Sequence, residues 1–350
     1  MNKNLQVMDV TLRDGSYAIN FQFSEADTRI LCKKLAEAGI EYVEIGHGVG
    51  LNASSPQHGE ALCTDEEYLA AAAESGTDVK YGMFCIPGTA KIEDLDKLVK
   101  GNASFVRIGT NVNEVSQSEK YIYRAKEIGL EVMANYMKSY ASSEEDFEKS
   151  VRLSKQYGAD VIYIVDSAGG MSKEKIKAFY EIIKSVGDIK VGFHGHDNMG
   201  LAVANSLYAV ELGFDFVDTS LRGMGRSAGN ASTELLCANL LKWYNCQKYD
   251  CQKLVECGDK YIKPMYNTLN HSALDIYCGI ADFHSSYMKY IHKYSAKYQV
   301  NPLELIVEYT KYDKINMDEV LLNQVASKLP TMKSDMIGYG FKDYFGNEQK

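Results

Sequence analysis

Two short stretches of this sequence, far apart in the chain, carry most of the side chains suited to metal chemistry. The segment Val191–Asn198 contains two histidines, His194 and His196, separated by one residue. Side chains two positions apart on a β-strand point the same way, so both imidazoles would face one point. Two neutral imidazoles and a carboxylate form a facial set for a divalent metal. We predict such a site; the structural alternative is a pair of polar residues at a strand end.

The carboxylate that would complete this set is Asp14, in the segment Thr11–Gly15 near the N-terminus. We expect Asp14 to end the first strand of a barrel and the histidines to end the seventh. Odd-numbered strands of an eight-stranded barrel share side-chain layers, so these two ends would meet. A 2-oxo acid would bind the metal through its carboxylate and keto oxygens, and the metal would stabilise an enolate as a Lewis acid.

Arg13 precedes the predicted ligand and would neutralise the oxyanion charge that develops on the substrate. Its structural alternative is a salt bridge to a barrel carboxylate such as Glu44, and both can hold, because a positioned arginine usually needs an orienting acid. The predicted strand ends are almost entirely polar, which is not the composition of a core. They carry Arg13, Asp14, Glu44, His47, Arg107, Asn135, Asp166, Ser167, His194, His196 and Asp218.

A repeating unit would position these residues: an apolar run, a polar loop and an amphipathic helix. Its recurrence predicts a parallel sheet buried on both faces, and eight such strands close an α/β (β/α)8 TIM barrel. The alternative, an open doubly wound sheet, would carry a Gly-rich phosphate-binding turn where this chain has Arg13–Ser16. Ser24 is expected to cap the first helix, and Gly39 to end it. The predicted strands are residues 5–12, 40–45, 79–86, 105–108, 130–136, 160–165, 189–194 and 214–219.

The strand pattern stops after Trp243. We predict a catalytic barrel domain over residues 1–262, a helical communication and partner region over 263–330, and a loosely ordered tail over 331–350. Tyrosines recur at helical spacing from Tyr277 to Tyr298. We interpret them as a face that packs against the barrel; the functional alternative is closure of the barrel mouth or contact with a partner. The predicted helices are residues 251–262, 276–297, 302–311 and 317–329.

The composition limits the partners, the location and the state of the cysteines that we expect for this protein. The 350 residues carry a formal net charge of −9, which argues against nucleic acid or an anionic membrane as the main partner. The start of the chain has no signal-like region, and no apolar run reaches membrane-spanning length, so we expect a cytoplasmic enzyme. The eight cysteines are scattered without a C-x-x-C pair, and we expect them to be reduced.

The sequence resembles the DRE-TIM metallolyase superfamily of HMG-CoA lyase-like barrels, and within it the 4-hydroxy-2-oxovalerate aldolases. Thr11–Gly15 is similar to the superfamily's first-strand motif, and His194–Ser206 to its seventh-strand motif. Other stretches resemble the aldolase branch, and the resemblance extends to about residue 329. These stretches are His47–Leu51 followed by Ser54 and Ser55, Gly223–Asn230, and Ser285–Tyr287 with the following helix and Asn301–Leu305.

This resemblance implies that the enzyme cleaves, or forms, a 4-hydroxy-2-oxo acid, with pyruvate and an aldehyde as the fragments and Mn²⁺ or Mg²⁺ as cofactor. The carried-over metal ligands are Asp14, His194 and His196, and Arg13 carries over as the enolate-stabilising residue. Asn230 carries over as a metal or near-metal residue. An acylating aldehyde dehydrogenase is implied as partner of the helical region, and we also expect a homo-oligomer.

The chain departs from these relatives at one important position. The aldolases carry a histidine four residues after the motif arginine, as base for the C4 hydroxyl, and here that residue is Tyr17. An unperturbed tyrosine has a pKa near 10. Tyr17 would therefore donate a hydrogen bond, or simply pack, while a water, His284 or His47 takes the proton. His284 stands where the aldolases have a tyrosine ahead of a Ser-Ser pair.

Two other functions stay open on sequence alone. A synthase could join acetyl-CoA to a 2-oxo acid by Claisen chemistry on the same barrel, as isopropylmalate and homocitrate synthases do. A degenerate homologue could keep only its partner-binding helices. The sequence leaves the identity of the aldehyde, the stereochemistry and the native metal open.

Overall fold

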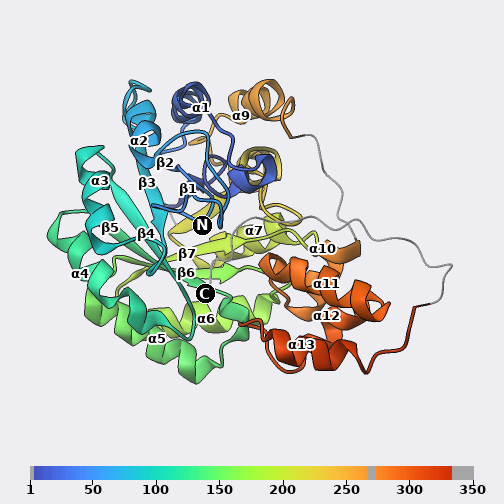
Figure 1. Ribbon diagram of the computed structural model, residues 1–350. Coiled ribbons are helices and arrows are strands. Elements are labelled where there is room, and N and C mark those ends of the chain that lie inside the picture. The colour runs from blue at the N-terminus through green and yellow to red at the C-terminus, as the bar shows by residue number, and fades with distance from the viewer. Residues whose placement is uncertain (1–3, 267–272, 333–350) are drawn as a thin grey trace.

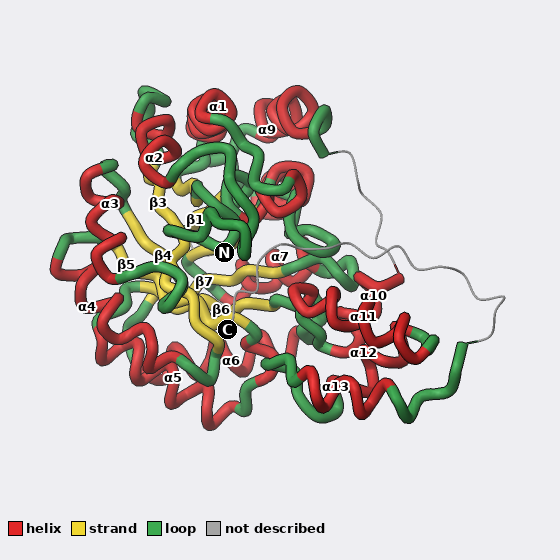
Figure 2. The backbone as a smooth tube through the Cα atoms, viewed as in Figure 1, coloured by secondary structure: helices red, strands yellow, loops and turns green. Residues whose placement is uncertain are grey.

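Eight parallel strands close into a barrel in chain order, with β8 pairing back to β1, in the computed structural model of the protein (Figures 1 and 2). The structure describes residues 4–266 and 273–332. The predicted (β/α)8 TIM barrel with a C-terminal helical region is thus confirmed. The strands are β1 (Gln6–Asp9), β2 (Tyr42–Glu44), β3 (Lys80–Cys85), β4 (Phe105–Asn111), β5 (Glu131–Met137), β6 (Val161–Asp166), β7 (Lys190–Gly195) and β8 (Phe216–Thr219).

Helices form the outer layer of the barrel (Figure 1). The first begins as predicted: the Ser24 hydroxyl accepts a hydrogen bond from the Asp27 N–H, and the Asp27 carboxylate accepts one from the Ser24 N–H. Gly39, with a φ of +90°, follows its end. The outer helices are α1 (Glu25–Glu37), α2 (Asp65–Ala73), α3 (Leu95–Lys100), α4 (Glu119–Glu127), α5 (Glu144–Tyr157), α6 (Lys173–Val186), α7 (Ala202–Leu212) and α8 (Thr233–Tyr244).

The interior of the barrel divides into an apolar and a polar part. Strand side chains that face outward pack with the helices in the largest buried cluster. A separate buried cluster, mostly apolar, includes Met8, Tyr42, Phe105, Tyr163 and Phe216. Charged side chains occupy the carboxyl ends of the strands instead, where catalytic groups of such barrels lie. The apolar cluster therefore forms a floor beneath a polar mouth.

The C-terminal helices have a buried apolar core of their own and lie beside the barrel (Figure 1). The predicted long helix over 276–297 is wrong, because Asp282 adopts a left-handed φ of +54° and divides it. Tyr287, Tyr294 and Tyr309 are buried within this helical core rather than mainly against the barrel. The helices that form this core are α10 (Ala273–Ala281), α11 (Met288–Tyr298), α12 (Pro302–Thr310) and α13 (Glu319–Ala326). The preceding α9 (Cys251–Cys257) and a π-helical turn (Gly258–Ile262) pack with the barrel instead.

Most of the predicted loosely ordered tail, residues 333–350, lies outside the described residues. Its first two residues are paired with the helical region: Thr331 forms a β-bridge with Val300, and the Met332 N–H donates to the Gln299 carbonyl. In residues 4–266 and 273–332, no helix has the length and apolar character that crossing a membrane requires. All eight cysteines are free thiols in the structure.

Candidate active site

The two histidines converge at the end of β7. Their Nε2 atoms lie 3.4 Å apart. The Nδ1 atom of His194 is 2.9 Å from an Asp218 carboxylate oxygen, and that of His196 is 3.2 Å from the Gly229 carbonyl. These partners only accept, so each Nδ1 carries the proton and each Nε2 presents a lone pair. Two facing lone pairs suit a shared cation, since ligands about 2.1 Å from one ion at right angles lie about 3 Å apart.

Asp14 reaches the same point from a turn, which corrects the prediction that it ends the first strand. β1 stops at Asp9, and the Arg13 N–H then donates to the Val10 carbonyl, which bends the chain into a short 3-10 helix (Asp14–Ile19). One carboxylate oxygen of Asp14 and one ring nitrogen of each histidine nonetheless lie within 4.8 Å of one another. The three predicted ligands are therefore brought together by a loop and a strand, not by two strands.

The protonation states at this point suit a divalent cation. Burial raises the pKa of Asp14, but Arg13 and the two imidazoles outweigh it and hold this pKa well below its usual range. Burial lowers the pKa of His196 to about 3, so this imidazole is neutral at pH 7. Asn230 donates to Asp14 at 2.7 Å. The buried Asn230 Oδ1 has no hydrogen-bond partner among the described residues and is available to a cation or its water.

A chain of buried charges supports these groups. Arg13 contacts the Asp14 carboxylate and the Glu44 carboxylate, both at 2.7 Å, so the salt bridge to Glu44 is present. Arg107 lies 3.0 Å from the same Glu44 oxygen and 2.6 Å from Asp218. Asp218 also accepts from His194, which closes the chain. The order of contacts is Asp14, Arg13, Glu44, Arg107, Asp218 and His194, all at most 5% exposed.

The roles of Arg107 and Asp218 were not predicted, although the sequence places both at polar strand ends. Burial lowers the pKa of Arg107, but Asp218 and Glu44 outweigh it, so the pKa is raised and the guanidinium stays charged. Asp218 is likewise kept ionised by Arg107 and His194 against its burial, so its pKa is lowered. A signal was available: on barrel strands, a buried arginine requires buried acids, and these are the nearest strand-end acids.

Tyr17 and His284 both lie close to Arg226. The Arg226 guanidinium lies 5.3 Å from the Tyr17 ring centroid, and its Nη2 lies 2.7 Å from His284 Nε2. Arginine only donates, so Nε2 accepts and the Nδ1–H of His284 donates to Ser286 Oγ at 2.7 Å. Burial and the Arg226 charge hold the pKa of His284 well below its ordinary value. Arg226 was not predicted as a site residue, although it lies within the Gly223–Asn230 stretch that resembles the aldolases.

His47 stands apart from the other predicted catalytic residues. Its Nδ1 accepts from the Val49 N–H at 3.0 Å, and its Nε2 donates to the Gly59 carbonyl at 3.0 Å. The ring stacks on Phe21 with centroids 3.9 Å apart, and burial lowers the pKa of His47 to about 4. Both nitrogens hold the backbone of the loop after β2, an arrangement that favours a structural role.

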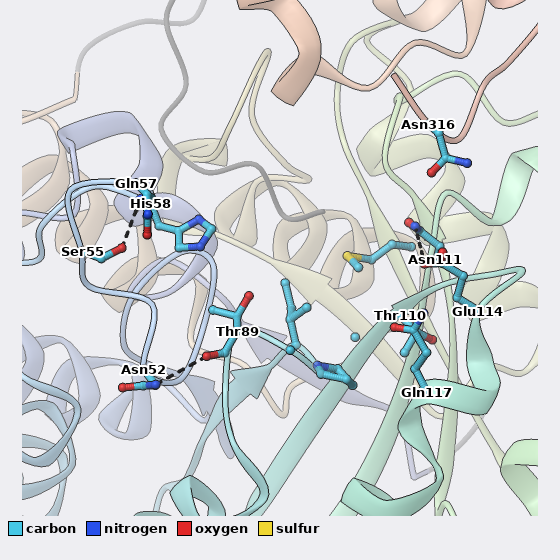
Figure 3. Close-up of a pocket in the computed structure, with 15 residues that line it drawn as sticks. Asn52, Ser55, Gln57, His58, Thr89, Thr110, Asn111, Glu114, Gln117 and Asn316 are labelled. Atoms are coloured by element: carbon cyan, nitrogen blue, oxygen red, sulfur yellow. Dashed lines mark hydrogen bonds between the residues drawn. The ribbon is translucent and has the colours of Figure 1, made fainter. Parts of the chain in front are cut away.

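A cavity of about 570 Å³ lies at the carboxyl ends of β3, β4 and β5 (Figure 3). Two of its lining residues, Ile86 and Met137, belong to one buried cluster with Tyr17 and Phe84. The Phe84 ring centroid lies 4.8 Å from the Arg13 guanidinium. One aromatic ring therefore lies between Arg13 and the residues of the cavity wall.

Comparison with known proteins shows what this chain is related to. The HMGL-like family model matches residues 4–260. A 4-hydroxy-2-oxovalerate aldolase from Carboxydothermus hydrogenoformans is 33% identical over 332 residues, covering 94% of this chain and 98% of the relative. Another, from Pelotomaculum thermopropionicum, is 35% identical over 330 residues, covering 94% and 97%. These matches confirm the resemblance predicted from the motifs.

Solved structures share the fold. The N-terminal domain of a putative aldolase from Bacteroides vulgatus has a TM-score of 0.68 at 24% identity, covering 88% of this chain and 97% of that one. The Bacillus subtilis HMG-CoA lyase has a TM-score of 0.64 at 17% identity, covering 76% and 95%. At these identities the likeness concerns the fold alone. The family model covers most of the chain, and the aldolase relatives extend to nearly all of it, so this chain belongs to the HMGL-like family.

Proposed function

We propose that this protein is a divalent-metal-dependent aldolase, a carbon–carbon lyase that cleaves or forms a 4-hydroxy-2-oxo acid. Pyruvate and an aldehyde are the fragments, and the metal is Mn²⁺ or Mg²⁺. The aldolase relatives support the reaction. The observation that carries the proposal is the convergence of Asp14 with two Nε2 lone pairs from His194 and His196. Asn230 lies beside them as a further oxygen donor.

A bound divalent ion would supply Lewis acidity toward the carboxylate and keto oxygens of a 2-oxo acid. Arg13 supplies the fixed positive charge. Two of its nitrogens bind Asp14 and Glu44, whereas its Nη2 makes no hydrogen bond within the described residues. Arg13 therefore keeps a donor for the oxygen on which enolate charge develops, and Glu44 holds the guanidinium in place.

Asp218 positions His194. It accepts from the Nδ1 of His194 and so directs the other ring nitrogen at the ligand point. Its second contact, to Arg107, ties it to Glu44 and thus to Arg13. The charge that binds substrate and the imidazole that binds metal are therefore oriented by one connected set of side chains.

Cleavage also requires a proton acceptor for the C4 hydroxyl. We assign the hydrogen bond to that hydroxyl to Tyr17 and the proton to His284 or a water. His284 is neutral and its Nε2 accepts, as a base requires, although Arg226 occupies that lone pair. His47 is disfavoured, because both of its nitrogens bind backbone groups.

The test supplies the purified protein with Mn²⁺ and a 4-hydroxy-2-oxo acid and measures pyruvate release. A second arm supplies acetyl-CoA and a 2-oxo acid and measures free CoA. We expect metal-dependent pyruvate release, abolished by a chelator, and no CoA release. CoA release without pyruvate would instead favour the synthase. Inactivity in both arms with metal bound would favour a non-catalytic homologue.

The proposal also covers the domains of the chain, its location in the cell, its oligomeric state and its partner protein. Residues 1–262 would be the catalytic domain of a cytoplasmic homo-oligomer, and residues 263–330 would pair with an acylating aldehyde dehydrogenase. The place of the helical region supports this. Asn198 beyond β7 donates to the Asp275 carbonyl at 3.0 Å, and Lys138 beyond β5 donates to the Ile315 carbonyl at 2.6 Å. Size-exclusion chromatography and co-purification test these partners.

A further inference from the structure

The cavity at the ends of β3, β4 and β5 occupies the side-chain layer above the buried charges. Residues two apart on a strand point the same way. Arg107 and Asn135 form a hydrogen bond of 3.2 Å inside the barrel. Asn111 stands four residues beyond Arg107 on β4, and Met137 two beyond Asn135 on β5, and both line the cavity. The cavity is therefore part of the barrel mouth.

The cavity also lies in the direction that a substrate would extend. The candidate ligands come from the β1 and β7 ends, on the other side of the barrel from β3 to β5. Phe84 on β3 faces Arg13, and Ile86, two residues further, lines the cavity. A 2-oxo acid whose carboxylate and keto oxygens lie at the metal ligands and Arg13 would direct C4 and the carbons beyond it over Phe84 into this space.

We propose that this cavity binds the aldehyde part of the substrate, and that this part is an uncharged chain carrying several hydroxyl groups. The inference rests on the proposed aldolase function. Eight of the fifteen lining residues carry amide or hydroxyl side chains, which can donate and accept hydrogen bonds as an alcohol requires. The side chains that carry this argument are Asn52, Thr89, Thr110, Asn111, Gln117 and Asn316 (Figure 3).

The size of the cavity agrees with a chain rather than with a small aldehyde. Its volume of about 570 Å³ lies within the range of roughly 300–1,000 Å³ that small-molecule sites show. A molecule of liquid water takes about 30 Å³. Acetaldehyde would leave most of the space, and most of the polar wall, to water. A sugar-like aldehyde of about four to six carbons fills it better.

The charge of the wall excludes phosphorylated chains. Among the described residues that line the cavity, the only titratable side chains are Glu114 and His58, and neither Lys nor Arg is present. Glu114 accepts a hydrogen bond from Asn111 at 2.9 Å. Phosphate recognition typically uses arginine or lysine. A carboxylate repels phosphate but accepts hydrogen bonds from hydroxyls.

The reaction on such a substrate needs no further reagent. In the forming direction, C3 of pyruvate loses a proton to the base and its electron pair bonds to the aldehyde carbon. The aldehyde oxygen takes up a proton and becomes the C4 hydroxyl. Cleavage is the reverse, and no oxidation or reduction occurs.

The test compares acetaldehyde, D-erythrose and D-erythrose 4-phosphate as acceptors for pyruvate with the Mn²⁺-loaded enzyme. We expect kcat/KM for D-erythrose to exceed that for each of the other two at least tenfold. The double variant Thr110→Val, Gln117→Leu should lose about tenfold for D-erythrose and change little for acetaldehyde. Gln324→Leu, an exposed position on α13, is the matched control and should change neither.

A further measurement follows the exchange of the pyruvate methyl protons in deuterated water, which needs only enolisation. It distinguishes the aldolase function from the assignment of the cavity. Exchange without a preference for D-erythrose, or with a preference that the double variant retains, overturns the cavity assignment and leaves the aldolase function standing. A preference for the phosphorylated acceptor overturns the uncharged class. Absence of both exchange and aldol product overturns the aldolase function and this inference with it.

Discussion

The two sides of the barrel mouth differ in how their polar groups are held. On the ligand side, Asp14, Arg13 and His194 belong to one buried chain of charges. On the cavity side, amides such as Asn52 and Gln117 are exposed and neutral. Removing one member of the buried chain leaves an uncompensated charge out of water, whereas an exposed amide can be replaced alone. Under the proposed function, the ligand side would fix the chemistry, and the cavity side would be free to set the substrate.

On the ligand side, the removal of a metal ligand should have the largest effect on metal binding and on activity. We expect His196→Ala to lose the metal and to lower kcat/KM by about 1,000-fold or more, since the ion supplies the Lewis acidity of the reaction. Elemental analysis measures the metal, and His292→Ala at an exposed position of α11 is the control. Full metal content in His196→Ala would contradict the ligand assignment.

Arg13→Lys keeps the positive charge and tests whether the planar guanidinium group is required. A lysine ammonium lacks the planar fork with which Arg13 contacts Asp14 and Glu44 while a third nitrogen stays available. We expect turnover to fall about 100-fold, in the range seen when one oxyanion donor is lost. Metal content should be retained. Near-normal steady-state turnover in Arg13→Lys would argue against the enolate role.

Asp218→Asn tests the positioning of His194. The amide can donate to the imidazole and thereby favour the wrong tautomer, with the proton on the nitrogen that should bind metal. Loss of such an outer partner typically lowers metal affinity about 10- to 100-fold. Titration with Mn²⁺ measures this, and excess metal should restore part of the turnover. An unchanged dissociation constant for Mn²⁺ would show that Asp218 has no role in orienting His194.

Local patterns predicted the features that depend on local geometry. The spacing of His194 and His196 indicated their shared direction, and the recurring strand and helix units indicated the closed barrel. Sequence patterns did not predict the features that are created by contacts between distant segments. Arg226 and His284, for example, are 58 residues apart in sequence. The turn that presents Asp14 was missed for another reason: it depends on a local hydrogen bond from the Arg13 N–H to the Val10 carbonyl, which the residue types did not indicate. The cavity was not predicted either, because its walls come from separate loops.

Tyr17→Phe separates catalytic from structural use of this tyrosine. The phenyl ring would keep its packing with Phe21, whose centroid is 5.1 Å away, and its place beside Arg226. If the hydroxyl contacts substrate, we expect turnover to fall about tenfold, with metal content unchanged and an altered dependence of kcat on pH. If turnover and its pH dependence both stay the same, Tyr17 is structural.

Asp9→Asn should affect stability alone, and it tests why the acids of the ligand side stay ionised. Asp9 is as buried as Asp14, but its oxygens accept from the Thr11 N–H at 3.0 Å and the Thr233 hydroxyl at 2.8 Å instead of from a cation. Burial outweighs these hydrogen bonds and raises the pKa of Asp9 to about 6. An acid left with hydroxyl partners is thus driven toward its neutral form.

The sign of the stability change follows from that shift. The folded state binds the Asp9 proton more tightly than the unfolded chain does, where the pKa is about 3.9. The stabilisation by the neutral acid is therefore complete below pH ~4 and disappears as the pH rises through about 6, a change of ~3 kcal/mol at most. Asp9→Asn keeps an oxygen for Thr11 and cannot ionise. Relative to wild type, it should gain stability as the pH rises from about 4 to about 7 in urea unfolding.

The exposed variant Asp188→Asn is the control for this gain. A constant stability difference between Asp9→Asn and wild type across that pH range would mean that burial does not raise the pKa of Asp9. The contrast with Asp14 would then no longer show that Arg13 is what keeps the ligand carboxylate charged. A difference that grows with pH would instead assign the ionisation of Asp14 to its cation, because burial is common to both acids.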